Sequence, residues 1–272
     1  MKKKKIEALI SWIIILIFAF YSITPLFLLF LNAFKTRGEI FSNPFKLPEK
    51  FTFTNFVKAW QNADLGAGLF NSFILASLSA ILVVVIGGTA AYALSKKAKF
   101  SSNIMLFLLF CTTIPLFIIL MPLFSWFKQI NLDNIFGVII ITVGLSLPFS
   151  IMLLRSFLIA IPPELEEAAL IDGANQWQIF WKIIVPVSRS GFITVGLINF
   201  LGGWNAFTIP LTFLGNPNQQ TIIIKLYTLS GQYTAPWGQI FAGIVITILP
   251  VLILFLSLQK YFVKGLIGGS FK

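Results

Sequence analysis

Between two long apolar runs of the chain stands the acidic stretch Glu164-Leu165-Glu166-Glu167-Ala168-Ala169-Leu170-Ile171-Asp172-Gly173. Pro162 and Pro163 precede it, and they suit the start of a helix because their missing N–H groups would have no helical partner there. The glutamates lie in the first turns, where negative charge complements the positive helix end. Gly173 suits the left-handed residue that follows a helix. The stretch therefore predicts a short polar helix with defined ends.

A second short helix is predicted directly after the first. Asn175 is a good N-cap, and Gln178 three residues later completes a capping box. Pro186 is expected to end this helix. Its apolar residues recur at helical spacing and form an amphipathic stripe, made of Trp177, Phe180, Trp181 and Ile184. Residues 160–187 are thus predicted to form a helical loop between two apolar runs.

The remainder of the chain is much more apolar than this loop. Of its 272 residues 57% are hydrophobic and only 11% are charged, and the mean hydropathy is +0.91. A soluble domain usually has about a quarter of its residues charged. A soluble fold could not bury so much apolar surface, so the composition predicts a protein embedded in lipid. With the helical spans that follow, the expected fold is an all-α integral membrane protein.

Six apolar windows are long enough to cross a membrane, since a spanning helix needs about 20 mostly apolar residues. Trimmed of their polar ends, they predict spans near 10–32, 69–94, 104–126, 135–155, 192–213 and 239–259. We expect one membrane domain over residues 1–272. Lys2–Lys5 would suit a signal peptide, but the apolar run that follows exceeds the usual h-region of about 7–15 residues. An uncleaved first span is therefore predicted.

Lysine and arginine predict the orientation, because cytoplasmic segments carry an excess of them. If the N-terminus is cytoplasmic, more than half of the basic residues lie on the cytoplasmic side of the membrane. They are Lys2–Lys5, Lys96, Lys97, Lys99, Arg155, Lys182, Arg189, Lys260, Lys264 and Lys272. Both termini and the loop at 160–187 are then cytoplasmic. The segment 214–238 is an outer loop whose β-branched middle, Thr221–Leu226, favours an extended conformation.

Several kinds of site are excluded by what the sequence lacks. There is no histidine, and Cys111 is the single cysteine, so a His-based metal site, a catalytic triad and an internal disulfide are all excluded. The sequence contains no Gly-Lys dipeptide and therefore no P-loop. We expect no catalytic residue, cofactor or metal. The net charge of +11 suits membrane orientation better than a nucleic-acid partner.

The first loop helix is predicted to be a docking element. Ala169 and Gly173 are four residues apart and share one helix face, which with Ala168 leaves that face nearly bare. Glu167 and Asp172 flank this face and can offer carboxylates to a partner. The alternative is a helix that lies on the lipid headgroups, but such helices usually carry basic residues. For the tryptophans of the second helix, docking and an interfacial position remain equally open.

The loop resembles the signature of permeases from binding-protein-dependent ABC importers. That signature is Glu-Ala-Ala, three residues, Gly, nine residues, Ile, one residue, an aliphatic residue and Pro, and it is matched by Glu167, Ala168, Ala169, Gly173, Ile183, Val185 and Pro186. Three further segments resemble the carbohydrate branch of the maltose-permease type: Asn71-Ser72, Trp204-Asn205-x-Phe207 and residues 259–266. Ala206 departs from that branch, in which an acidic residue or its amide is common.

The resemblance implies a type I ABC importer permease architecture with six transmembrane helices and a cytoplasmic coupling-helix loop. It implies a non-enzymatic subunit of an ATP-driven importer of mono- or oligosaccharides in the bacterial cytoplasmic membrane. Its implied partners are two ATP-binding subunits, a second homologous permease, an extracytoplasmic sugar-binding protein, the sugar and lipid. The residues expected to couple to the ATPase are Glu167, Ala168, Ala169, Asp172, Gly173, Ile183 and Pro186.

The candidates for lining the pathway are Asn71, Asn199, Trp204 and Asn205. Each can instead make an interhelical hydrogen bond or a packing contact, and for the last three both interpretations are equally supported. No charged residue lies deep in a predicted span, which favours a neutral substrate. The alternatives are a secondary transporter or channel for a small neutral solute, and a membrane scaffold without transport.

Overall fold

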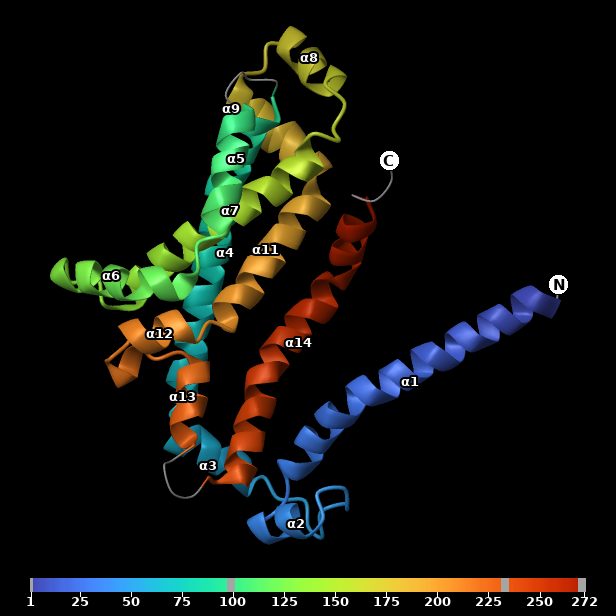
Figure 1. Ribbon diagram of the computed structural model, residues 1–272, viewed down its shortest axis with the longest axis vertical. Coiled ribbons are helices and arrows are strands. Elements are labelled where there is room, and N and C mark those ends of the chain that lie inside the picture. Colours follow the sequence, from blue (N-terminus) through green and yellow to red (C-terminus); the bar gives the residue numbers. More distant parts are fainter. Residues whose placement is uncertain (1, 97–100, 231–234, 269–272) are drawn as a thin grey trace. The chain divides into compact units, whose positions relative to one another are not determined.

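The computed structural model describes residues 2–96, 101–230 and 235–268 (Figure 1). Within these ranges all regular structure is helical, as the sequence predicts. Three lysines of the predicted cytoplasmic segments lie outside the described residues, namely Lys97, Lys99 and Lys272, as do residues 231–234 of the predicted outer loop. The chain divides into two compact units.

Unit 1 consists of residues 1–66 and 225–250. Its elements are α1 (Lys2–Asn32), α2 (Arg37–Ser42), α3 (Thr54–Asn62), the second half of α13 (Ile222–Leu229) and the first part of α14 (Trp237–Gly268). The side-chain amide of Asn55 donates to the carbonyls of Ala33 at 2.9 Å and Lys35 at 2.8 Å. The chain that follows α1 is thereby fastened to α3.

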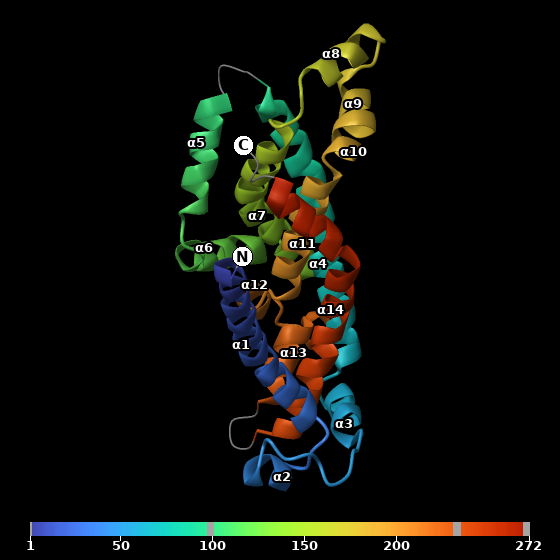
Figure 2. The same cartoon turned by 90° about the vertical axis from the view of Figure 1, so that its right-hand side faces the viewer.

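Unit 2 consists of residues 67–224 and 251–272. In chain order its elements are α4 (Leu65–Ser95), α5 (Ser101–Thr112), α6 (Leu116–Gln129), α7 (Ile135–Leu158), α8 (Glu164–Ile171), α9 (Gln176–Ile179), the π-helix η1 (Phe180–Ile184), α10 (Val185–Val187), α11 (Arg189–Trp204), α12 (Thr208–Phe213), the 3-10 helix η2 (Pro217–Gln219), the start of α13 and the last part of α14. In both views α4, α7 and α11 run side by side (Figures 1 and 2).

Two apolar clusters hold these helices together. The first joins Leu75 of α4, Val138 of α7 and Phe213 of α12. The second joins Leu154 of α7, Phe180 of η1 and Val195 of α11. Outside the lipid, burial of such side chains contributes most of the free energy that favours packing. Within the lipid, close van der Waals contact between helices contributes most of it. The second cluster packs the loop helices against the ends of the long helices.

Among the described residues, four helical segments are long and apolar enough to cross a membrane alone: Leu9–Asn32, Leu65–Ser95, Ile135–Leu158 and Trp237–Gln259. The number rises to six if two bent helix pairs each count as one span. The helix predicted over 104–126 is one of these pairs, since α5 and α6 meet at 89°. Pro115 lies at the break, where it lacks an N–H and disfavours a helical conformation of the residue before it.

The helix predicted over 192–213 is also interrupted. It ends at Trp204, and helical structure resumes only at Thr208. Pro210 cannot donate the hydrogen bond that a continuous helix would direct to the carbonyl of Ala206, which explains the interruption. The other bent pair instead joins the segment Gln176–Val187 to α11 at 83°.

The expectation of an extended conformation at Thr221–Leu226 is wrong, because α13 begins at Ile222. The hydroxyl of Ser72 accepts a hydrogen bond of 2.9 Å from the backbone N–H of Ile222. Ile222 and Ile224 are buried, at 0% and 1% exposed. Tertiary packing therefore overrides the β-propensity of these branched side chains.

Candidate functional site

The loop that follows α7 has the two helices that the sequence predicts. The first, α8, begins after Pro163 and closes in a Schellman motif, in which Ala174 N–H donates to the Ala169 carbonyl at 3.0 Å and Gly173 N–H to the Leu170 carbonyl at 3.1 Å. Gly173 has φ +82°, as predicted. An added Cβ there would meet no atom within 4 Å, so Gly173 is required for its backbone conformation rather than for space within this chain.

The second helix begins with the predicted capping box. The Asn175 side chain accepts from the Gln178 N–H at 2.9 Å, and the Gln178 side chain accepts from the Asn175 N–H at 2.9 Å. The helix then widens into the π-turn η1 and continues to Val187, one residue beyond the predicted end at Pro186. The wide turn suits Pro186, which cannot donate to the Lys182 carbonyl as an α-helix would require.

The faces of α8 differ from the prediction. Ala169 is buried at 7% exposed and packs with Ile179 and Phe180 in the second apolar cluster, so it faces the chain's own core. The open side of α8 carries the exposed Glu167 and Ala168. It also carries Ile171, which is 86% exposed. The surface available to a partner is therefore partly apolar rather than bare.

The predicted stripe of the second helix is split between two environments. Phe180 and Ile184 are buried, at 2% and 1% exposed, whereas Trp177 is 62% exposed and Trp181 is 38% exposed. Ile183 is half-buried against the second apolar cluster, and Pro186 is exposed. The two tryptophans are thus available to a partner or to lipid headgroups.

A polar cluster joins the loop helices to the C-terminal end of α4; we call its four residues, Tyr92, Lys96, Glu166 and Gln176, the α4–loop cluster. The Tyr92 hydroxyl donates to Glu166 Oε2 at 3.0 Å and lies 3.2 Å from Gln176 Oε1. The Lys96 ammonium lies 3.3 Å from Glu166 Oε2, donates to Gln176 Oε1, and sits 4.4 Å from the Tyr92 ring centre. Figure 1 shows α8 and α9 at the same end of unit 2 as the C-terminus of α4.

The charge of Lys96 is stabilised by these contacts. Partial burial works to lower the pKa of its ammonium, but interaction with Tyr92 and Glu166 outweighs that effect and raises the pKa above its ordinary value. The contribution of Lys96 to stability is therefore complete at neutral pH and is lost only as the pH rises through this raised pKa. The cluster keeps its positive member throughout the physiological range.

This cluster was not predicted from the sequence, in which Lys96 indicates only the orientation and Glu166 only a charge at a helix end. The hydrogen-bonded pairs are 74 to 84 residues apart in sequence, so no local pattern could reveal them. The end of α4 has a further anchor, because its Leu94 carbonyl accepts from Arg155 Nε at 2.8 Å and Ser101 Oγ at 2.7 Å.

Two of the predicted pathway residues have their amide groups engaged within the chain. Asn71 donates to the carbonyls of Asn218 at 2.8 Å and Gln220 at 3.0 Å. Asn199 donates to Ser150 Oγ at 2.9 Å, which links α11 to α7. Both side chains are at least nine-tenths buried. These contacts favour the packing interpretation for both residues.

The other two pathway candidates lie at the break that follows α11. Trp204 is 2% exposed and stacks on Phe200 with ring centres 5.9 Å apart. Its indole Nε1 has no hydrogen-bond partner in the part of the chain that the structure describes. Asn205 is exposed at the end of the helix. Asn205 therefore retains a side chain that a solute could reach.

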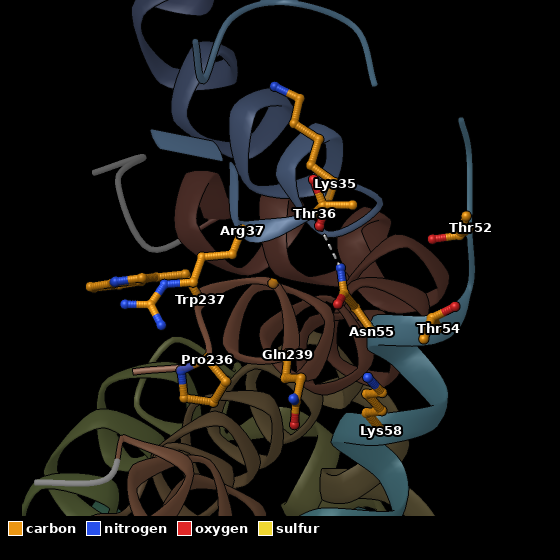
Figure 3. Close-up of a pocket in the computed structure, with 11 residues that line it drawn as sticks. Lys35, Thr36, Arg37, Thr52, Thr54, Asn55, Lys58, Pro236, Trp237 and Gln239 are labelled. Atoms are coloured by element: carbon orange, nitrogen blue, oxygen red, sulfur yellow. Dashed lines mark hydrogen bonds between the residues drawn. The ribbon is translucent and has the colours of Figure 1, made fainter. Parts of the chain in front are cut away.

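A polar pocket of about 500 Å³ lies in unit 1 (Figure 3). It is lined by Lys35, Thr36, Arg37, Thr52, Thr54, Asn55, Lys58, Pro236, Trp237, Gly238 and Gln239. The Lys35 ammonium is buried elsewhere, where it donates to the carbonyls of Asn43 at 3.3 Å and Pro44 at 2.8 Å. Burial lowers the pKa of Lys35, and the nearby Glu39 carboxylate opposes that effect. Arg37 and Lys58 thus provide the cationic side chains of the pocket.

Comparison with known proteins agrees with this architecture. The chain resembles the crystal structure of a bacterial ABC transporter involved in the import of the acidic polysaccharide alginate, with a TM-score of 0.84 and 22% identity over 96% of this chain and 98% of that chain. At this identity the likeness concerns the fold.

Curated relatives extend over nearly the whole chain. The diacetylchitobiose uptake system permease protein NgcG of Streptomyces coelicolor is 32% identical over 97% of this chain and 89% of the relative. The melibiose/raffinose/stachyose import permease protein MelC of Bacillus subtilis is 30% identical over 91% of each.

The family comparison covers the helices that carry the candidate site. Residues 83–268 match the model of the family described as binding-protein-dependent transport system inner membrane component. That range includes the whole loop of 160–187 and the end of α4. The resemblance inferred from the loop is thereby confirmed, and with several apolar helices the chain is a multi-pass membrane protein. The chain belongs to the family of inner membrane components of binding-protein-dependent transport systems.

Proposed function

We propose that this chain is the permease subunit of an ATP-driven sugar importer and binds its ATPase through the helical loop at 160–187. The observation that carries the proposal is the open side of α8. Ile171, at 86% exposed, protrudes from a helix whose two ends are fixed by Pro163 and Gly173. Leu170 beside it is 48% exposed, and an exposed apolar surface rimmed by polar residues marks an interaction site.

In this proposal the ATPase contacts the exposed side of the loop. Glu167 and Asp172 offer carboxylates beside the apolar Ile171, and Ala168 leaves room for close approach. Four residues of the loop determine its conformation and do not contact the ATPase directly: Ala169, Gly173, Ile183 and Pro186. Two ATPase subunits, a second homologous permease and an extracytoplasmic binding protein complete the assembly. Both termini are cytoplasmic.

A neutral sugar is the proposed substrate class. Two relatives that align with nearly the whole of this chain are named for the uptake of sugars. One is named for diacetylchitobiose, and the other for melibiose, raffinose and stachyose. Ion-coupled transport usually relies on ionisable groups within the spans, and the sequence has none deep in its apolar windows. The exposed Asn205 is the pathway candidate that the structure leaves most accessible.

The docking role is tested by replacing Ile171 with aspartate. The variant is coexpressed with the ATPase, the binding protein and the partner permease from the same genome, and the ATPase retained on the tagged chain is measured. A central apolar contact at an interface contributes about 2 kcal/mol or more, so retention is expected to fall at least about tenfold. Uptake of labelled raffinose and diacetylchitobiose by cells is measured in parallel.

Phe41→Asp is the matched control. Phe41 is also an exposed apolar residue, at 63% exposed, but it lies on α2. This helix is between the first two predicted spans, so a cytoplasmic N-terminus places it outside. We expect this variant to retain the ATPase at the unmodified level. Equal retention by the Ile171→Asp and Phe41→Asp variants would overturn the docking role of α8.

A further inference from the structure

The three glutamates of α8 have different environments. Glu164 and Glu167 are exposed, whereas Glu166 is partly buried. Glu166 turns toward α4, where its carboxylate meets the Tyr92 hydroxyl at 3.0 Å and the Lys96 ammonium at 3.3 Å. Glu166 therefore belongs to the internal attachment of α8 rather than to its open side.

The contact is more directional than the apolar packing around it. Hydrogen bonds in which a partner is charged are about twice as strong as neutral ones and have defined geometry. Gln176 at the start of α9 accepts from Lys96 in the same cluster. Both loop helices are thus bonded to the same end of α4.

Apolar packing alone would hold these elements less precisely. Tyr92 also contacts Phe180, with ring centres 5.4 Å apart. Such ring contacts lack the fixed donor and acceptor positions of the cluster. The end of α4 is in turn hydrogen-bonded to Arg155 of α7 and to Ser101 of α5, which links it to two more helices.

We propose that Tyr92, Lys96, Glu166 and Gln176 are positioning residues that make α8 and the end of α4 move as one body when the ATPase acts on the loop. This proposal rests on the proposed function, since it names the internal partner of the docking loop. The α4–loop cluster would carry displacement of α8 to α4, and through Leu94 to α5 and α7.

The test measures the distance between α8 and α4 by pulsed electron paramagnetic resonance. Spin labels are placed at Leu165→Cys on α8 and Ile86→Cys on α4 in a Cys111→Ser background; Leu165 and Ile86 are both exposed. The complete complex in nanodiscs is measured without nucleotide and after trapping with Mg-ATP and vanadate. We expect the same interlabel distance in both states, because the cluster holds the two helices together.

Three substitutions distinguish the effect of the α4–loop cluster from that of the residues around it. Glu166→Gln removes the charge, and Tyr92→Phe removes only the hydroxyl while keeping the ring against Phe180. Glu164→Gln is the matched control on the same helix, because Glu164 is exposed. The two cluster variants are expected to show a distance shift on trapping that the control does not show. Reversal of the charges in Glu166→Lys/Lys96→Glu is expected to restore the constant distance.

The outcomes distinguish this inference from the proposed function. If the ATPase does not bind the unmodified chain, the proposed function fails. The labelled permease alone then still reports whether Glu166→Gln broadens the distance distribution, and an unchanged distribution would overturn the link between the helices. If the ATPase binds and both cluster variants keep a constant distance on trapping, the cluster does not transmit the movement and the proposal is wrong.

Discussion

At the scale of single residues, two adjacent glycines of α11 have opposite surroundings. A Cβ added to Gly203 would lie 2.9 Å from the Cα of Ala76 on α4, whereas one added to Gly202 would meet nothing within 4 Å. The first glycine therefore permits close contact between two long helices, as small residues commonly do in membranes. The sequence pair Gly202-Gly203 cannot tell which of the two has this role.

We expect Gly203→Ala to destabilise the chain and Gly202→Ala to leave it unchanged or more stable. Both substitutions improve helix propensity by about 1 kcal/mol. At Gly203 the clash with backbone opposes that gain, and overpacking typically costs about 1–3 kcal/mol. Thermal unfolding of both purified variants in detergent, followed by tryptophan fluorescence, measures the difference. Equal midpoints would contradict the assigned contact between α4 and α11.

At the scale of elements, the short helix α2 depends on one carboxylate. Glu39 accepts from the Thr36 N–H at 2.8 Å through one oxygen and from the Glu49 N–H at 2.8 Å through the other. These bonds, with a hydrogen bond from the Thr36 hydroxyl, lower the pKa of Glu39 to about 2. One side chain thus caps α2 and fastens the chain that follows it.

We expect the segment 36–49 to loosen as the pH falls from about 4.5 toward 2, with little change between pH 5 and 8. Because the folded-state pKa is depressed, the ionised Glu39 stabilises the segment above its unfolded pKa of about 4.3. That contribution is lost as the pH falls through the folded value of about 2. Hydrogen exchange of this segment across the pH range measures the effect.

Glu39→Gln is expected to remove most of this pH dependence and to increase exchange at neutral pH. Glu49→Gln is the matched control, since Glu49 contributes its backbone N–H and keeps that donor when its side chain changes. If the two variants show the same exchange, the role assigned to the Glu39 carboxylate is wrong.

Local sequence patterns predicted some features of these elements and missed others. The capping box at Asn175 and the left-handed Gly173 were predictable because each motif is complete within a few residues. The breaks at Pro115 and after Trp204 could not be predicted from the prolines alone, because the sequence does not show whether neighbouring groups will satisfy the freed backbone. The helix at Ile222 was missed because its cap comes from Ser72, 150 residues away.

At the scale of the whole molecule, family membership and helix lengths fit a protein that crosses the membrane several times. The proposed orientation rests on the excess of lysine and arginine in the segments assigned to the cytoplasm. It places α2 and α8 on opposite sides of the membrane.

This orientation predicts the labelling of single cysteines introduced at Ser42 and Ile171 in a Cys111→Ser background; Ser42 and Ile171 are both exposed. A membrane-impermeant maleimide added to intact spheroplasts is expected to label the cysteine at Ser42. The cysteine at Ile171 is expected to react only after permeabilisation. The reverse pattern would invert the topology and would remove α8 from the side on which ATP is available.

The sequence by itself determined the class of the protein, the places of its four uninterrupted apolar helices and the caps at Gly173 and Asn175. Those features are local, because a helix satisfies its backbone hydrogen bonds within one segment and a cap acts within one turn. Tertiary structure alone decided that Ala169 faces inward, that Asn71 and Asn199 bind within the chain, and that Glu166 turns to Tyr92 and Lys96. These depend on residues far apart in sequence, which only the packing of the helices brings together. The acidic stretch Glu164–Gly173 thus has two kinds of glutamate, exposed and internally bonded, which the sequence alone could not distinguish.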